Sequence, residues 1–193
     1  MTNNIKLIGV VGAGQMGLGI AQVFATSGFD VLINDNNKIS LSNSSEVIKA
    51  NLKKAINKGR LHKNAGISSV KKIKSEFDIS QLGKCDLIIE AATEDEKIKH
   101  EIFKDLIPHL QPHTILTSNT SSISITRLAA RTDRPEKFMG CHFMKPAPVM
   151  QLVELVRGIA TNEETANCLK DLVKKIGKIS TNSEDFPAFI VNR

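Results

Sequence analysis

The hydrophobic positions near the N-terminus form two short, mostly apolar runs with a helical pattern between them. The first run covers residues 5–11 and the second covers residues 29–33. Between the two runs, Ile20, Val23 and Phe24 recur at helical spacing. Short continuous apolar runs rich in β-branched residues are typical of strands buried in a parallel sheet. The pattern therefore predicts a strand, a helix and a second strand.

The same alternation continues along the chain. Further apolar runs predict strands at residues 77–80, 85–92, 114–117, 138–143, 151–156 and 178–181. Amphipathic stretches predict helices at residues 46–58, 93–107, 124–130 and 161–176, with a helical linker over 60–75 and a new helix beginning at 185. This order favours an α/β fold of Rossmann type, a doubly wound and mostly parallel sheet with helices on both faces.

A glycine-rich turn joins the first predicted strand to its helix. The glycines have the spacing G-x-G-x-x-G, in which the first permits a tight turn, the second lets the backbone approach a pyrophosphate, and the third allows close packing of the helix. The N-terminus of the helix also favours phosphate. We therefore expect six residues of the turn to bind a dinucleotide: Gly12, Ala13, Gly14, Gln15, Met16 and Gly17.

The second predicted strand ends on Asp35. An acid at this point can accept hydrogen bonds from the ribose hydroxyls of adenosine, whereas a 2′-phosphate would face a like charge. No Arg occurs in residues 36–38 to offset that charge. The predicted cofactor is therefore NAD. The alternative is a loop that merely needs small residues, but the two strands, the helix and the terminal acid together favour the dinucleotide.

A proline-containing turn separates two predicted strands that carry His142 and Glu154. Such a turn can fold the second strand back beside the first, which would bring the carboxylate to the imidazole. Histidine titrates near neutral pH and accepts protons well, and a carboxylate partner fixes its tautomer. The pair fits removal of a proton from an alcohol while a hydride leaves to a nicotinamide. The alternative is a histidine satisfied within its strand and a glutamate in an ordinary ion pair.

Polar segments follow two further predicted strands. Because the carboxyl ends of parallel strands meet at one edge of a sheet, we expect these segments to lie beside the glycine-rich turn. Asn119 and Ser121 could hydrogen-bond a nicotinamide amide or a substrate oxygen, or else cap the next helix. Glu94 and Lys99 could contact the cofactor, or else form a helix cap and a surface ion pair.

Composition narrows the class of protein. The 193 residues are 41% hydrophobic and 24% charged, as in an ordinary globular domain. No apolar run reaches the ~18 residues of a membrane span, and the N-terminus has no signal-peptide pattern, so we expect a cytoplasmic protein with no membrane partner. Three scattered cysteines predict neither a disulfide scaffold nor a metal site.

The net charge of +6 does not predict a nucleic-acid partner. The chain has no Trp or Tyr, and its basic residues do not alternate with aromatic residues that could stack on bases. A small polyanionic ligand explains the excess charge equally well, and so does a generally lysine-rich proteome.

Longer phrases resemble the NAD-binding domain of the 3-hydroxyacyl-CoA dehydrogenases. These phrases are GVVGAGQMGLGIAQVFATSGFDV, LIIEAATED, SNTSSISIT, the block from PE-F-GCHF-K to PAPVMQLVELV, and FIVNR. The resemblance implies NAD-dependent interconversion of an L-3-hydroxyacyl-CoA and a 3-oxoacyl-CoA, with a short-chain substrate such as 3-hydroxybutyryl-CoA.

The resemblance also implies roles for individual residues. His142 would be the catalytic base, Glu154 would orient it, and Ser121 would contact the substrate oxygen on the nicotinamide side. Further contacts would come from Glu94 and Asn119 in the nicotinamide pocket, Lys99 at the cofactor, Asn192 in the active site and Lys58 at coenzyme A.

Two positions depart from the family pattern, Lys145 in place of a neutral amide and Ala188 in place of a glycine. The family also carries a C-terminal helical domain that closes the substrate cleft and forms a homodimer. We expect residues 1–184 to form the NAD-binding domain. We expect residues 185–193 to be the start of that second domain, truncated after its first residues. The alternatives are a related hydroxy-acid dehydrogenase, such as a gulonate-type enzyme, and a non-catalytic NAD-binding module.

Overall fold

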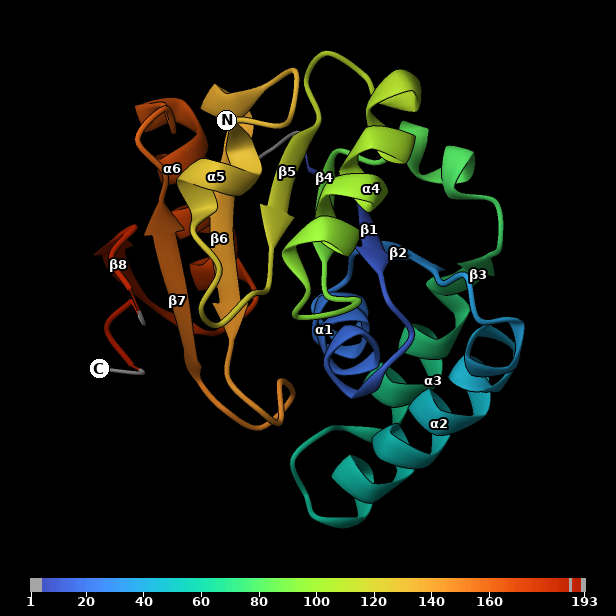
Figure 1. Cartoon of the computed structure of the whole chain (residues 1–193). Coiled ribbons are helices and arrows are strands. Elements are labelled where there is room, and N and C mark those ends of the chain that lie inside the picture. The colour runs from blue at the N-terminus through green and yellow to red at the C-terminus, as the bar shows by residue number, and fades with distance from the viewer. Residues whose placement is uncertain (1–4, 188, 192–193) are drawn as a thin grey trace.

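An eight-stranded sheet forms the centre of the molecule, with strand order β3-β2-β1-β4-β5-β6-β7-β8 (Figure 1). The computed structural model describes residues 5–187 and 189–191. The strands are β1 (Leu7–Val11), β2 (Asp30–Asn34), β3 (Ile73–Glu76), β4 (Leu87–Glu90), β5 (Ile115–Ser118), β6 (Phe138–Phe143), β7 (Leu152–Arg157) and β8 (Ile179–Glu184). Neighbouring strands are parallel except β6 and β7, which are antiparallel. The predicted doubly wound, mostly parallel sheet is confirmed.

Helices pack on both faces of this sheet. They are α1 (Gln15–Thr26), α2 (Lys38–Asn57), α3 (Lys63–Lys71), α4 (Glu96–Leu106), α5 (Ile125–Ala129) and α6 (Glu163–Lys175), with short 3-10 turns at Ile79–Lys84, Ile107–His109 and Pro135–Lys137. Buried side chains of α1, α2 and α6 form one apolar layer, and those of α4 and α5 form the other.

The order of the strands reverses at β1. This strand pairs with β2 on one side and with β4 on the other. The helix that follows β1 packs on one face of the sheet, and the helix that follows β4 packs on the opposite face. In such sheets a crevice opens at the carboxyl ends of the strands where the order reverses, and ligands bind there. The crevice here lies between the turn after β1 and the loop after β4.

The turn between β1 and α1 is packed too closely for side chains at two of its three glycines. Gly12 has a φ of 107°, and a Cβ on it would lie 2.7 Å from the carbonyl oxygen of Ala91. A Cβ on Gly17 would lie 1.8 Å from the carbonyl oxygen of Gly12. A Cβ on Gly14 would meet no heavy atom within 4 Å. Gly12 and Gly17 therefore shape the turn, while Gly14 faces open space.

The structure corrects the predicted start of α2. The helix begins at Lys38 and not near residue 46, because Asn37 caps it. The Asn37 side-chain oxygen accepts hydrogen bonds from the N–H groups of Ile39 and Ser40, each at 3.0 Å. Asparagine is among the best N-cap residues, and the polar residues that follow it form the solvent-facing first turns of the helix.

Two further segments differ from the prediction. Residues 60–75, predicted as a helical linker, contain α3 and also most of β3, which pairs with β2 at the edge of the sheet. Residues 77–80, predicted as a strand, lead into a 3-10 turn that Asp78 caps through the N–H of Ser80. None of the four residues of β3 is buried. This edge strand therefore lacks the continuous apolar run that identifies the buried strands.

In the described residues 185–187 and 189–191, the segment after β8 forms a bend and turns and not the predicted helix. Asp185 accepts hydrogen bonds from the hydroxyl of Ser124 at 2.7 Å and from the N–H groups of Ile125 and Thr126 at 2.9 and 2.8 Å. The aspartate therefore caps the start of α5, far away in sequence, and does not start a helix of its own.

The close packing at Gly17 makes a testable prediction. We expect Gly17→Ala to lower the free energy of unfolding by about 1–3 kcal/mol or more, because the added methyl group overlaps the Gly12 carbonyl oxygen. Gly14→Ala is the matched control and should cost under about 1 kcal/mol, the difference between glycine and alanine at an N-cap. Urea denaturation of both variants would measure this, and equal midpoints would contradict the packing argument.

Candidate functional site

Three of the predicted segments meet at the carboxyl ends of β1, β4 and β5. They line a cavity of about 300 Å³ whose wall is made of Gly14, Gln15, Met16, Ala91, Ala92, Thr93, Glu94, Lys99 and Asn119. The expectation that the glycine-rich turn and the two polar segments are neighbours is therefore confirmed. The N-terminus of α1 opens into this cavity with Gly14 as its N-cap, so unpaired N–H groups face the space that a diphosphate would need.

Asp35 lies beside the glycine-rich turn at the end of β2. Its Oδ2 accepts a hydrogen bond from the N–H of Ala13 at 2.6 Å, and its Oδ1 accepts one from the N–H of Asn37 at 2.7 Å. Asp35 also borders a second cavity of about 700 Å³. Ile98 and Ile102 of α4 line the same cavity. Ile98 is 46% exposed, so an apolar wall and a carboxylate face one cavity, as an adenosine would require.

Glu94 does not cap α4, because Asp95 does so through the N–H groups of Lys97 and Ile98. Oε1 of Glu94 instead accepts hydrogen bonds from three consecutive residues of the loop after β5. The donors are the Thr120 hydroxyl at 2.6 Å, the Ser121 N–H at 2.8 Å, the Ser121 hydroxyl at 3.1 Å and the Ser122 hydroxyl at 3.0 Å. This carboxylate therefore ties the loop after β4 to the loop after β5.

These donors also keep Glu94 ionised. Burial opposes the charged form, but the hydrogen bonds from Thr120, Ser121 and Ser122, together with the charge of Lys99, outweigh burial and hold the pKa of Glu94 below its usual value. Hydrogen bonds donated to a carboxylate favour its charged form. A negative charge is thus fixed at the wall of the cavity at neutral pH.

Lys99 is buried and not at the surface. Its side chain is 1% exposed, and its Nζ donates a hydrogen bond to Oε2 of Glu90 at 2.5 Å. The alternative expectation of a surface ion pair between Glu94 and Lys99 is therefore wrong. Sequence reasoning did not single out Glu90, although a charged residue inside an otherwise apolar predicted strand was a signal that could have found it.

His142 and Glu154 face each other across β6 and β7. The antiparallel register places one directly opposite the other, and His142 Nδ1 lies 3.0 Å from Glu154 Oε2. Both residues are buried. The prediction that the turn folds the second strand back beside the first is confirmed. Because a carboxylate only accepts hydrogen bonds, Nδ1 carries the proton, and Nε2 is the nitrogen that can accept one.

The second oxygen of Glu154 is held by the segment after β8. Oε1 accepts hydrogen bonds from the N–H groups of Ile190 at 2.7 Å and Val191 at 3.0 Å. The ring of Phe189, which is buried, lies 6.3 Å from the His142 ring between centroids. Both carboxylate oxygens are therefore occupied, so the orientation of Glu154 is fixed. Backbone donors have no sequence signal, which is why this contact was not predicted.

Asn119 connects the cofactor loops to the histidine strand. Its side-chain oxygen accepts a hydrogen bond from the N–H of Phe143 at 2.8 Å, next to His142. The alternative expectation, in which Asn119 or Ser121 caps the next helix, is wrong, because Ser124 is the N-cap of α5. Asn192 and Ala188 lie outside the described residues.

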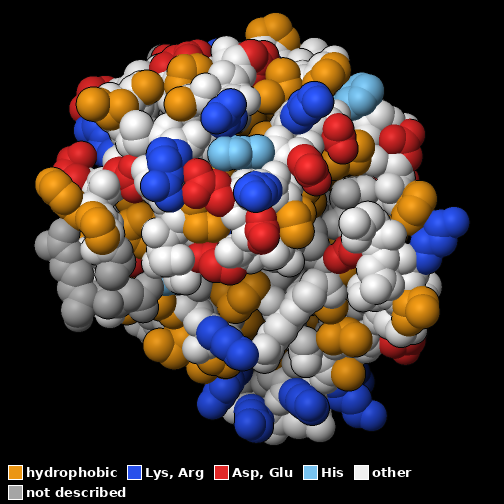
Figure 2. Space-filling view, viewed as in Figure 1, with side chains coloured by type: hydrophobic (Ala, Val, Ile, Leu, Met, Phe, Trp, Pro, Cys, Tyr) orange, Lys and Arg blue, Asp and Glu red, His pale blue; other side chains and the backbone are white. Residues whose placement is uncertain are grey.

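Lys58 borders a separate groove of about 480 Å³ between α1, the end of α2 and the turn after β6. Lys54, Arg60 and Lys178 line the same groove. Figure 2 shows Lys and Arg side chains gathered at the end of the molecule that α2 and α3 form. Lys145 is exposed in the turn after β6. Positive charge in this groove would attract a phosphate-bearing ligand.

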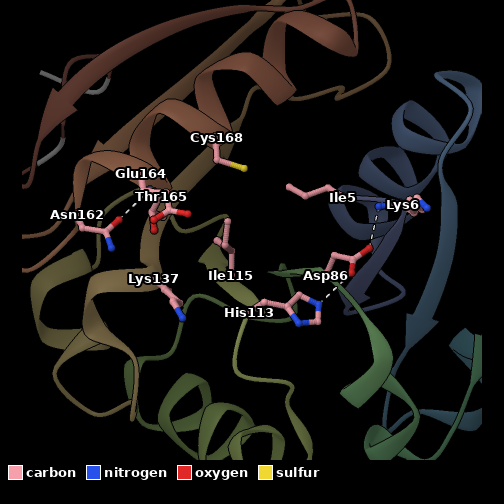
Figure 3. A pocket seen from close by; sticks show the side chains of 10 residues that line it. All are labelled: Ile5, Lys6, Asp86, His113, Ile115, Lys137, Asn162, Glu164, Thr165 and Cys168. Atoms are coloured by element: carbon pink, nitrogen blue, oxygen red, sulfur yellow. Dashed lines mark hydrogen bonds and ion pairs between the residues drawn. The ribbon is translucent and has the colours of Figure 1, made fainter. Parts of the chain in front are cut away.

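A further cavity of about 690 Å³ lies at the opposite ends of the strands (Figure 3). Asp86, in the wall of this cavity, accepts a hydrogen bond from the N–H of Lys6 at 2.8 Å and lies 3.1 Å from His113 Nε2. None of the described residues that line this cavity belongs to the predicted site. It is therefore separate from the cofactor edge of the sheet.

The described part of the chain contains no group of three His, Cys, Asp or Glu side chains arranged to hold a metal ion. Burial raises the pKa of the Cys85 and Cys141 thiols to about 12, so neither is a nucleophile at neutral pH. Within residues 5–187 and 189–191, no helix combines the length and the apolar character that crossing a membrane requires.

A family model described as "3-hydroxyacyl-CoA dehydrogenase, NAD binding domain" matches residues 7–186. The chain belongs to this family. The family description names NAD, so the predicted cofactor is confirmed, and the crevice at the carboxyl ends of β1 and β4 is where this fold binds a dinucleotide.

Members of the family from distant organisms match nearly the whole chain. A 3-hydroxybutyryl-CoA dehydrogenase of Bradyrhizobium diazoefficiens is 50% identical over 189 residues, which are 98% of this chain and 64% of the relative. A mitochondrial hydroxyacyl-coenzyme A dehydrogenase of Sus scrofa is 40% identical and is covered to 62%. The crystal structure of (S)-3-hydroxybutyryl-CoA dehydrogenase from Ralstonia eutropha superposes with a TM-score of 0.95 at 39% identity, over 98% of this chain and 67% of that chain. The chain thus spans about two thirds of the length of these relatives.

The hydrogen bonds to Glu94 predict a pH-dependent contribution to stability. Because the pKa of Glu94 is lowered in the folded protein, its charge stabilises the fold above its ordinary pKa, and this contribution is lost as the pH falls through the lowered value. We expect Glu94→Gln to lower the melting temperature at pH 7 and to approach the wild type below about pH 4.

The matched control is Glu101→Gln, since Glu101 is an exposed residue of α4. Thermal denaturation followed by circular dichroism between pH 3.5 and 8 would measure both variants. A Glu94→Gln difference that stays constant over this range would contradict the argument.

Proposed function

We propose that this chain carries the NAD-dependent interconversion of an L-3-hydroxyacyl-CoA and the corresponding 3-oxoacyl-CoA. The observation that carries the proposal is the buried His142–Glu154 pair, which lies at the same edge of the sheet as the cofactor cavity, to which Asn119 connects it. Relatives named 3-hydroxybutyryl-CoA dehydrogenase support a short acyl chain. We therefore propose 3-hydroxybutyryl-CoA as the substrate.

His142 is proposed as the general base. Its Nε2 removes the proton of the 3-hydroxyl group, and the charge of Glu154 stabilises the imidazolium that forms. In the reverse direction the imidazolium returns this proton to the oxygen. Bound NAD supplies the acceptor for the hydride that leaves C3. Ser121 is proposed to hydrogen-bond the substrate oxygen, and Asn192 is proposed to act beside it.

The residues of the cofactor cavity fit a bound dinucleotide. The open space at Gly14, where a Cβ would meet nothing within 4 Å, leaves room for a pyrophosphate at the N-terminus of α1. We propose that Ala13, Gln15 and Met16 contact it through the backbone, that Asp35 binds the adenosine ribose, and that Glu94, Lys99 and Asn119 hold the nicotinamide end.

The basic groove is proposed to bind the acyl-CoA. Lys58 is the predicted contact, and Lys54 and Arg60 line the same groove, so their charges would attract the phosphates of coenzyme A. The boundary after residue 184, a homodimer formed through a C-terminal helical domain, and a cytoplasmic location remain predictions.

A direct assay tests the proposed activity. We expect the chain to consume NADH in the presence of acetoacetyl-CoA, followed by absorbance, and we expect His142→Gln to lower the rate by about 10²-fold or more because it removes the general base. The matched control is His113→Gln, which changes an exposed histidine at the opposite end of the sheet and should leave the rate unchanged.

Three outcomes would contradict the proposal. Equal rates for His142→Gln and the wild type would remove the base assignment. Consumption of NADH with free oxo acids, which are reduced to hydroxy acids, but not with oxoacyl-CoA thioesters would favour the related dehydrogenase of hydroxy acids. Binding of NADH, seen by fluorescence, without consumption would leave a cofactor-binding module.

A further inference from the structure

Glu90, at the end of β4, is the hub of a buried polar cluster beneath the cofactor cavity. Its side chain is 0% exposed. Oε1 accepts a hydrogen bond from the N–H of Ala92 at 2.9 Å, and Oε2 accepts one from the hydroxyl of Ser118 at 2.8 Å and one from Lys99 Nζ at 2.5 Å. The cluster therefore joins β4, β5 and α4 at the edge of the sheet where the cofactor cavity opens.

The ammonium group of Lys99 has N–H groups that no described residue of this cluster accepts. Among the described residues its ammonium group donates one hydrogen bond, to Glu90, although an ammonium group has three N–H groups. Lys99 also lines the cofactor cavity together with Gly14 and Asn119. A buried cation at the wall of a cavity, with N–H groups unused by the protein, is suited to bind an oxygen atom of a ligand.

Stability alone does not explain this ion pair. Moving two charges out of water costs more free energy than their attraction returns unless the geometry is good and the remaining lone pairs are satisfied, and an apolar pair of similar volume is often as stable. The hydrogen bonds from Ala92 and Ser118 occupy Glu90 and leave its direction fixed. The ion pair thus holds the Lys99 side chain in one place at the cavity wall.

We propose that Glu90 is a positioning residue for the cofactor, which holds the Lys99 ammonium charged and aimed at an oxygen of the bound dinucleotide. The inference rests on the cofactor contact proposed for Lys99. The ionisable groups that interact with Lys99 in the described residues are Glu90 on β4 and Glu94 before α4. Glu94 is engaged by the loop after β5, so Glu90 supplies the countercharge.

NADH binding across a range of pH tests the proposal. In Glu90→Gln the buried ammonium loses its countercharge, and burial then favours its neutral form. We expect the dissociation constant for NADH, measured by fluorescence, to rise about tenfold between pH 6.5 and 9, the size expected for loss of a charged hydrogen bond. The wild type should change much less over this range.

Three further variants separate positioning from a structural role. Lys99→Met should weaken NADH binding equally at every pH, because it removes the ammonium group itself. Ser118→Ala removes one hydrogen bond to Glu90 but keeps the ion pair and the hydrogen bond from Ala92, so it should weaken NADH binding much less than Glu90→Gln. The apolar double variant Glu90→Met with Lys99→Met should fold, and it should bind NADH no more weakly than Lys99→Met alone, since Glu90 acts through Lys99.

The outcomes that overturn the proposal are distinct from failure of the proposed function. A Glu90→Gln variant that binds NADH like the wild type, or that weakens binding equally at every pH, would exclude the positioning role. Additive losses for Glu90 and Lys99 would do the same. These measurements need no acyl-CoA turnover, so an inactive chain that still binds NADH would contradict the proposed function and leave this inference standing. A wild-type chain that does not bind NADH would contradict both.

Discussion

The close contact between Gly17 and the carbonyl oxygen of Gly12 sets the position of α1, and the cofactor edge of the sheet depends on it. A Cβ at Gly17 would lie 1.8 Å from that oxygen, so helix and strand can be this close only because residue 17 is glycine. The N-terminus of α1 then lies in the crevice between β1 and β4. Gln15 and Met16, the first residues of α1, form part of the wall of the cavity of about 300 Å³ in this placement.

One antiparallel pair in the sheet brings His142 and Glu154 to that edge. In a purely parallel sheet, residues near the start of a strand lie at the edge opposite to the ligand. Because β7 runs antiparallel to β6, Glu154 near its start lies beside His142 near the end of β6. The reversal thus lets the final residues of one strand and the first residues of the next act together. The backbone N–H groups of Ile190 and Val191 complete the pair from the segment after β8.

The buried strands, the glycine-rich turn and the His142–Glu154 pair could be predicted because each has a local signal. Continuous apolar runs identify β1, β2 and β4, and glycines at fixed spacing identify the turn. Several of the missed features depend on packing between separate elements. Asp185 caps α5, although its own neighbours suggested a helix start. Glu90 contacts Lys99 only when β4 and α4 pack together. Glu154 is held by the backbone N–H groups of Ile190 and Val191, which every residue type except proline has, so the sequence gives no signal for this contact.

The facing of His142 and Glu154 across two strands also bears on how this chain can tolerate insertions and deletions during evolution. Side chains alternate between the two faces of a strand, so one residue added within β6 or β7 would turn the histidine or the glutamate to the opposite face while leaving the sheet paired. The turn over residues 144–151 lies outside both strands, where Lys178 donates hydrogen bonds to the carbonyl oxygens of Ala147 and Met150. Length changes there would alter those two bonds and keep the strands in register. This turn can therefore vary in length, whereas the two strands beside it must keep theirs.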